Sequence, residues 1–133
     1  MPSIHHEILI NVPAHAVWDA VRDVGALHTR LVPGFVSNTE MLAEAKTQTR
    51  RVTFANGVVV DEVIVDCDDQ RQRLVWTIKG VEHHNGVMTV AAAESGAHVT
   101  WTADVLPAEL AGRFAPSMAA GLAAMKAHLE MVV

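Results

Sequence analysis

The sequence predicts an α+β fold in which a curved antiparallel sheet of about seven strands wraps around one long C-terminal helix, in the order β-α-α-β6-α. Three observations lead to this expectation. Residues 3–11 alternate like a strand, residues 36–106 form strand-like segments broken by turns, and residues 107–131 carry one apolar stripe at helical spacing. Such a helix must bury its stripe, and the sheet is the only large partner. The 133 residues suit one domain, spanning 1–133.

The spacing of apolar residues in the first part of the chain changes at Pro13 from that of a strand to that of a helix. Residues 3–11 read as a strand, and the three- and four-residue apolar spacing over 13–24 predicts an amphipathic helix. Pro13 suits the first turn of that helix, where its missing N–H is not needed, and Gly25 ends it. A second short helix is expected over 26–31.

The middle of the chain predicts six strands separated by turn signals. Asn56-Gly57 is the strongest short hairpin signal, and Ser95-Gly96 marks a second hairpin. Gly80 and residues 83–86 read as an interruption between two strands. The strands are expected over residues 36–44, 48–54, 58–67, 73–79, 87–93 and 97–105.

The closing helix is expected over residues 107–131. Pro116 lies inside it and predicts a kink or a break near residues 112–115. A single helix about 10 Å wide cannot fill a broad concave sheet, so a cavity between the two is expected. The apolar stripe consists of Leu110, Phe114, Met118, Leu122, Met125, Leu129 and Val132.

Composition excludes several classes of function. Lys and Arg number 10 against 15 Asp and Glu, so the net charge of −5 argues against a nucleic-acid partner. The lone Cys67 rules out an internal disulfide, and no spacing matches a zinc site, a phosphate loop or a nucleophile motif. No metal or cofactor is therefore expected. Without a signal peptide or a membrane span, a cytoplasmic protein is the default, as monomer or homodimer.

The order of motifs resembles the START-like helix-grip (SRPBCC) superfamily, in particular its bacterial polyketide cyclase/dehydrase-like branch. The resemblance covers almost the whole chain. It implies a helix-grip fold, and activities that range from lipid and hormone carriers through aromatic cyclases to co-chaperone-like modules. Relatives often carry Tyr where this sequence has His84. The motifs are residues 8–18, Gly57 with Glu62 and Asp66, residues 74–78, residues 99–101 with Pro107, and Gly121-Leu122 with Met125-Lys126.

Glu62 is the first candidate site residue. Valines occupy both parities of residues 58–65, so either Asp61 or Glu62 must point inward. Parity groups Glu62 with Val60 and Ile64, and the resemblance selects Glu62 as well. One hypothesis is a carboxyl group in an apolar cavity, its pKa raised by desolvation, that exchanges a proton with a substrate. The alternative is a carboxylate paired with an arginine at the cavity rim, for example Arg51.

Three histidines are weighed separately. His84 shares parity with Met88 and would serve as a polar anchor or general base beside Glu62, unless it is a solvated loop residue. His83 would face the opposite side, so the pair cannot bind one metal. His6, on an inward face, is weighed as a ligand contact and as a hydrogen-bonded core residue.

The remaining candidates would form the walls of the cavity. Trp76 and Trp101 fall at inward parity on two strands, where they could contact an aromatic or acyl ligand or belong to the core. Met88, which shares parity with His84, is also expected to contact the ligand. The C-terminal helix supplies side chains that could be wall or core in the same way: Phe114, Met118, Leu122 and Met125.

Three functions are compatible with these residues. The first is binding of a small hydrophobic or aromatic molecule, lipid-like or polyketide-like, in the internal cavity, with Glu62 and His84 as polar anchors. The second is a cyclase or dehydratase in which Glu62 or His84 moves a proton. The third is a protein-interaction module with a filled core. An open void of several hundred Å³ would favour the first two.

Overall fold

A seven-stranded antiparallel sheet and a long C-terminal helix make up the computed structural model, which confirms the predicted fold. It describes residues 2–132, so the two ends of the predicted domain, Met1 and Val133, lie outside the described residues. The strands are β1 (Ser3–Ile10), β2 (Val36–Met41), β3 (Thr49–Phe54), β4 (Val59–Asp68), β5 (Arg73–Ile78), β6 (His83–Ala93) and β7 (Gly96–Leu106). The helices are α1 (Ala14–Val21), the π-helical turn η1 (Leu27–Leu31), the 3-10 turn η2 (Ala108–Leu110) and α2 (Ala111–Val132).

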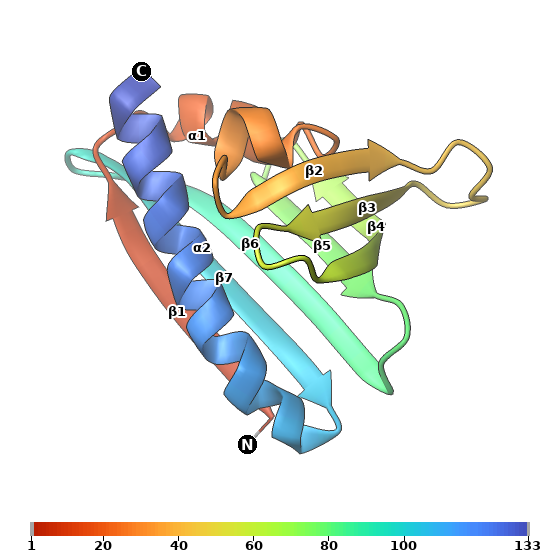
Figure 1. The fold of residues 1–133 in the computed structure, drawn as a ribbon. Helices are drawn as coiled ribbons and strands as arrows, with labels where there is room; N and C mark the ends of the chain where they lie inside the picture. Colours follow the sequence, from red (N-terminus) through yellow and green to blue (C-terminus); the bar gives the residue numbers. More distant parts are fainter. Residues whose placement is uncertain (1, 133) are drawn as a thin grey trace.

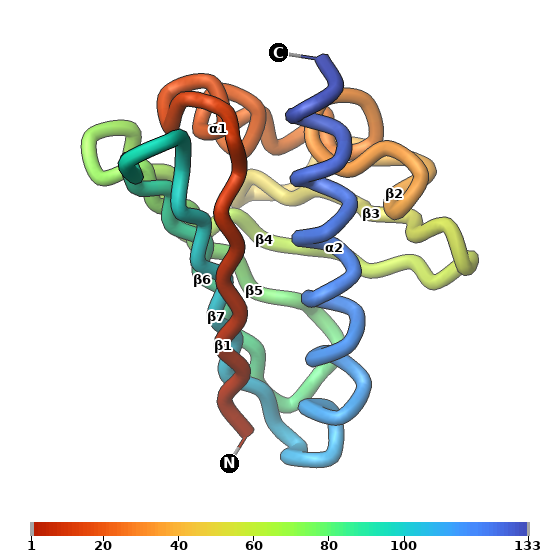
Figure 2. The backbone as a smooth tube through the Cα atoms, turned by 90° about the vertical axis from the view of Figure 1, so that its left-hand side faces the viewer, coloured from red at the N-terminus to blue at the C-terminus, as the bar shows by residue number. Residues whose placement is uncertain are grey.

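The sheet is a meander to which the N-terminal strand is added at one edge. Strands β2 to β7 follow one another in sequence order, and β1 pairs with β7. Helix α2 crosses one face of this curved sheet, with β2 and β3 on one side of it and β1 on the other (Figures 1 and 2). The sheet therefore has one face turned toward α2, here called the inner face, and one turned away from it, the outer face.

Helix α2 also protects the free edge of β1. The Lys126 ammonium donates a hydrogen bond of 2.8 Å to the Leu9 carbonyl oxygen, and the Asn11 backbone N–H donates one of 2.8 Å to Glu130. These side chains satisfy edge groups that would otherwise offer a template for another strand. They also hold the C-terminal half of α2 close to β1, as Figure 2 shows.

The apolar core is divided along α2. A large cluster joins the sheet to α1, η1 and the C-terminal half of α2, with Val17, Val52 and Val99 fully enclosed. A much smaller cluster of Ile4, Ala103 and Met118 lies below the N-terminal half. The space between the sheet and that half of the helix is therefore not closed by packing alone.

Strand β6 begins four residues earlier than predicted. It begins at His83, so residues 83–86 belong to a strand and are not an interruption. Gly86 suggested a turn, but it lies opposite Trp76 in the ladder, where an added Cβ would come within 2.8 Å of the Trp76 ring. A glycine in a strand can mark close approach of a neighbouring group, and here that group is the indole.

The helical boundaries also differ from the prediction. Helix α1 is shorter, because Pro13 is its N-cap and the helix ends at Val21. Strand β2 ends at Met41, short of the expected residue 44. Helix α2 continues through Pro116 without a break. Pro116 lies in the second turn, where it removes one intrahelical hydrogen bond, and the helix is preceded by the 3-10 turn η2.

Candidate functional site

An internal cavity of about 550 Å³ lies between the inner face of the sheet and the N-terminal half of α2. Its walls are mostly apolar, and its opening is surrounded by the loop before β2, the β3–β4 turn and the first turns of α2. A cavity of this size accommodates a small organic molecule. The lining residues include Leu31, Phe35, Arg50, Val52, Phe54, Val60, Glu62, Trp76, His84, Met88, Trp101, Arg113, Phe114, Ser117, Met118, Gly121 and Met125.

The structure brings most of the sequence-predicted site residues to this cavity. Glu62, Trp76, His84, Met88, Trp101, Phe114, Met118 and Met125 line it. His6 instead lies beneath α2, with its Nε2 3.1 Å from the Ala115 carbonyl oxygen. Leu122 is buried in the large core cluster. Both residues hold the helix against the sheet, which fits the core reading of each.

A buried ion pair is the main polar feature of the cavity. Arg50 Nε donates a 2.8 Å hydrogen bond to Glu62 Oε1, and both side chains are more than nine-tenths buried. Arg50 Nη1 also donates to the Val24 carbonyl oxygen at 3.2 Å, and its guanidinium lies 5.6 Å from the centre of the Trp76 ring. Glu62 is therefore a carboxylate paired with an arginine, as in the alternative considered for it, and its partner is Arg50 and not Arg51.

Sequence reasoning missed Arg50, although it shares strand parity with Val52 and Phe54. Counting outward from a two-residue Asn56-Gly57 turn places residue 51 opposite residue 62. In the structure the loop spans three residues, 55–57, between the paired Phe54 and Val58, which shifts the β3–β4 register by one and places Arg50 opposite Glu62. Arg51 lies opposite Asp61 and forms an ion pair with it on the outer face. Consecutive strand residues point to opposite faces, so the register alone separates the two arginines.

His84 is held in a defined orientation on the inner face. The Ile78 backbone N–H donates a 3.1 Å hydrogen bond to His84 Nδ1, and the ring stands edge-on to Phe114 at 5.9 Å. Burial, with a smaller contribution from the neighbouring His83, lowers the pKa of His84 to about 4, and Asp104 partly opposes the shift. The ring is therefore neutral at pH 7. Because a backbone N–H can only donate, Nδ1 is the bare nitrogen and Nε2 carries the proton.

Aromatic rings form much of the remaining wall. Trp76 and Trp101 lie 5.8 Å apart with tilted planes, and Phe35 and Phe54 meet edge to face at 5.5 Å. The two phenylalanines were not expected in the site. Phe35 follows the Pro33-Gly34 turn, so no periodic pattern reveals its direction. Phe54 shares strand parity with Val52 in the expected strand 48–54, and that signal was overlooked.

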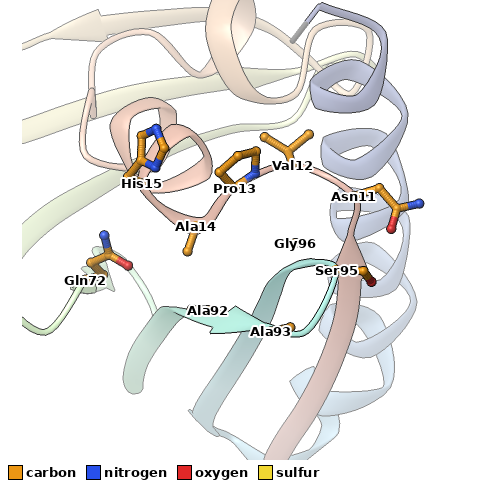
Figure 3. Close-up of a pocket in the computed structure, with 10 residues that line it drawn as sticks. All are labelled: Asn11, Val12, Pro13, Ala14, His15, Gln72, Ala92, Ala93, Ser95 and Gly96. Carbon is orange, nitrogen blue, oxygen red and sulfur yellow. The ribbon is translucent and has the colours of Figure 1, made fainter.

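A second depression of about 590 Å³ lies at the other end of the sheet, beside the start of α1 (Figure 3). It is more open than the internal cavity, and its polar side chains, such as Asn11, His15 and Ser95, are exposed to solvent. The two volumes are similar, so volume does not single out a site. The internal cavity is distinguished by the buried charged and polar groups on its wall.

Metal-ligand clusters and membrane-spanning helices are the two remaining features to consider in residues 2–132. No three or more His, Cys, Asp and Glu side chains among residues 2–132 are arranged to hold a metal ion. Within the same range, no helix combines the length and apolar character needed to cross a bilayer.

Comparison with solved structures supports the fold. The chain is similar to XoxI from Bacillus cereus (16% identity, 98% of each chain covered, TM-score 0.83). It is also similar to a protein from Thermobifida fusca (26% identity, 95% of this chain and 91% of that one, TM-score 0.75). The third similarity is to BexL, a di-domain ARO/CYC of the BE-7585A biosynthetic pathway (19% identity, 99% of this chain and 47% of that one, TM-score 0.81).

Family membership rests on the sequence. A search of curated proteins returned no match. The profile of the family described as polyketide cyclase / dehydrase and lipid transport matches residues 1–130, which is nearly the whole chain. With the seven-stranded sheet, the long helix and the cavity between them, the match shows that the chain belongs to the polyketide cyclase/dehydrase and lipid transport family.

Proposed function

We propose that the protein binds a small hydrophobic or aromatic molecule in the cavity between the sheet and α2. One observation carries the proposal: an apolar cavity of about 550 Å³ has a buried ion pair and a neutral histidine on its wall. A filled core would leave no such space, so the cavity favours ligand binding over the interaction-module hypothesis. Apolar walls supply affinity, and a few polar groups set the orientation of the ligand.

The expected driving force is burial of apolar ligand surface. At about 25 cal/mol per Å², a ligand that loses roughly 300 Å² of apolar surface gains on the order of 7 kcal/mol before the costs of association. The tryptophan and phenylalanine rings offer flat faces to a planar ligand. Met88, Met118 and Met125 adapt their shape to different ligands.

The cyclase or dehydratase alternative finds less support in the geometry. A general base needs a free lone pair facing the substrate. His84 uses the lone pair of Nδ1 to accept the Ile78 N–H and keeps its proton on Nε2. Glu62 Oε1 accepts the Arg50 hydrogen bond, which leaves Oε2 as a single candidate base. No second group beside it among residues 2–132 is free to return the proton, so the cavity supports hydrogen bonding of a ligand better than proton transfer.

The test is titration with pyrene, an uncharged planar probe, followed by tryptophan fluorescence and calorimetry. We expect one-to-one binding and quenching, because Trp76 and Trp101 lie in the cavity wall. Val60→Trp places a large ring in the cavity and should weaken binding about tenfold or more. Val59→Trp is the matched control, since Val59 is exposed on the adjacent position of β4.

Two results would overturn the proposal. One is the absence of pyrene binding to folded wild-type protein. The other is equal binding by the Val60→Trp and Val59→Trp variants, which would place the probe outside the cavity. Native mass spectrometry of freshly purified protein would add whether a small molecule is retained from the cell.

A further inference from the structure

We propose that the cavity selects an uncharged ligand bearing a hydroxyl group, and that the hydroxyl bridges Glu62 and His84 by donating to the first and accepting from the second. This inference rests on the proposed function and names the class of ligand it concerns. Three features of the cavity carry it: balanced charge, a free acceptor on Glu62 and a free donor on His84.

The charge of the cavity wall is balanced. Arg50 and Glu62 are buried and neutralise each other at 2.8 Å, and His84 is uncharged at pH 7. An anionic ligand such as a fatty acid would bring an unpaired charge into a largely apolar space, which is costly. Arg113 is the remaining charged residue of the lining, and it is exposed at the opening of the cavity. A carboxylate paired with Arg113 would therefore lie in water and not inside.

Glu62 supplies the free acceptor. Its Oε1 receives the Arg50 hydrogen bond, and Oε2 has no hydrogen-bond partner among residues 2–132. In that range, the side-chain atoms that are both occluded and unpartnered are His28 Nδ1, Thr39 Oγ1 and Trp101 Nε1. Glu62 Oε2 is not one of them, so it stays accessible from the cavity. A carboxylate oxygen in an apolar space is a strong acceptor for a ligand hydroxyl.

His84 supplies the free donor. Its Nδ1 is occupied by the Ile78 N–H, so Nε2–H is the group left for a ligand, and it too has no partner within residues 2–132. Ile78 also lies directly opposite Glu62 in the β4–β5 ladder. Glu62 on β4 and His84 on β6 are thus both neighbours of Ile78 on β5, and both line the cavity, so the hydroxyl would span β5 from one side chain to the other. A hydroxyl is the smallest group that satisfies both.

The test compares three probes that share one ring system: pyrene, 1-hydroxypyrene and pyrene-1-carboxylate. We expect 1-hydroxypyrene to bind about fivefold more tightly than pyrene. Pyrene-1-carboxylate should bind about tenfold or more weakly than 1-hydroxypyrene, because its charge has no partner in the cavity. Dissociation constants from calorimetry at pH 7 provide the measurement.

Glu62→Gln sharpens the test by changing the charge of the cavity. The glutamine amide oxygen can still accept from Arg50, while the arginine charge is no longer neutralised. The carboxylate probe should then bind more tightly than the hydroxyl probe, which reverses the wild-type order. Asp61→Asn is the matched control: it makes the same chemical change one residue away, on the outer face, and should keep the wild-type order.

The outcomes separate this inference from the proposed function. If pyrene does not bind, the proposed function fails. If pyrene binds and wild-type protein accepts the carboxylate as well as the hydroxyl, the inference fails alone, and loss of carboxylate binding in Arg113→Gln would assign the cause to that arginine. The wild-type comparison stands even if Glu62→Gln does not fold. In a folded Glu62→Gln variant, an unchanged order of probes also overturns the inference.

Discussion

Two ion pairs on neighbouring residues of the same two strands lie in opposite environments. Arg50–Glu62 is on the inner face with side chains almost fully buried, whereas the Arg51 side chain of the Arg51–Asp61 pair is 46% exposed. The residue types and the pairing geometry are nearly the same. The difference shows that a one-residue step in strand parity decides whether a charge pair belongs to the cavity or to the solvent-facing surface.

The largest effect is expected from breaking the inner pair. Arg50→Met leaves Glu62 as a buried, unpaired carboxylate, and we expect a loss of about 3–5 kcal/mol in the free energy of unfolding. Urea denaturation monitored by circular dichroism measures it. The double variant Arg50→Met/Glu62→Met removes both charges and should recover much of the loss, because apolar side chains of similar size suit this environment. A double variant as unstable as Arg50→Met alone would contradict the account.

The next effect is a pH dependence that originates on the inner face. Well above pH 6.5, His84 is neutral in both the folded and the unfolded chain and causes no loss of stability. As the pH falls from 6.5 to about 4, the unfolded chain binds a proton that the buried ring does not, so stability falls across that window. The difference between the two pKa values corresponds to a loss of about 3 kcal/mol in the free energy of unfolding.

The measurement is urea denaturation of wild-type protein and His84→Gln at several values between pH 7.5 and 4.5. The variant should lose less stability than wild type as the pH falls. His15→Asn, at an exposed position of α1, is the control and should follow wild type. Parallel curves for wild type and His84→Gln would show that the ring does not carry the dependence.

A smaller effect is expected at Gly86, which faces the Trp76 and His84 rings. A Cβ there would lie 2.8 Å from the Trp76 ring and 3.0 Å from His84 Cε1. Gly86→Ala should therefore cost about 1–3 kcal/mol through overpacking. Gly112→Ala on α2 meets no atom within 4 Å and should be neutral or slightly stabilising, as alanine is the better helix former. In thermal unfolding, Gly86→Ala should lower the midpoint temperature, whereas Gly112→Ala should leave it unchanged or raise it slightly.

The smallest effect is expected at the outer pair. Arg51 lowers the pKa of Asp61 mainly through their hydrogen bond, but the pair is open to water, where exposed ion pairs add little stability. Arg51→Met should shift the urea midpoint far less than Arg50→Met does. Equal shifts in these two variants would remove the distinction between the faces.

Alternation along the chain was enough to predict the fold and the inward direction of Trp76 and His84. For Glu62 it left Asp61 as an alternative, and the resemblance to a known family supported the choice. It failed where no period exists: Phe35 follows a turn, and residues 83–86 looked like a turn because of His83-His84-Asn85-Gly86. It also could not separate wall from core on α2, where Leu122 is packed and Met118 lines the cavity. A helical stripe shows which face is buried, but not how far the sheet lies from each turn.

The sequence by itself determined the sheet, the long helix and the inward direction of several strand side chains, such as Trp76 and His84, because strand and helix periods are local properties of the chain. Only the tertiary structure decided that Arg50 would neutralise Glu62 and that Ile78 would fix the tautomer of His84. Those contacts depend on strand register and on how α2 crosses the sheet. They join residues that no local period connects, and they decide which polar atoms are left for a ligand.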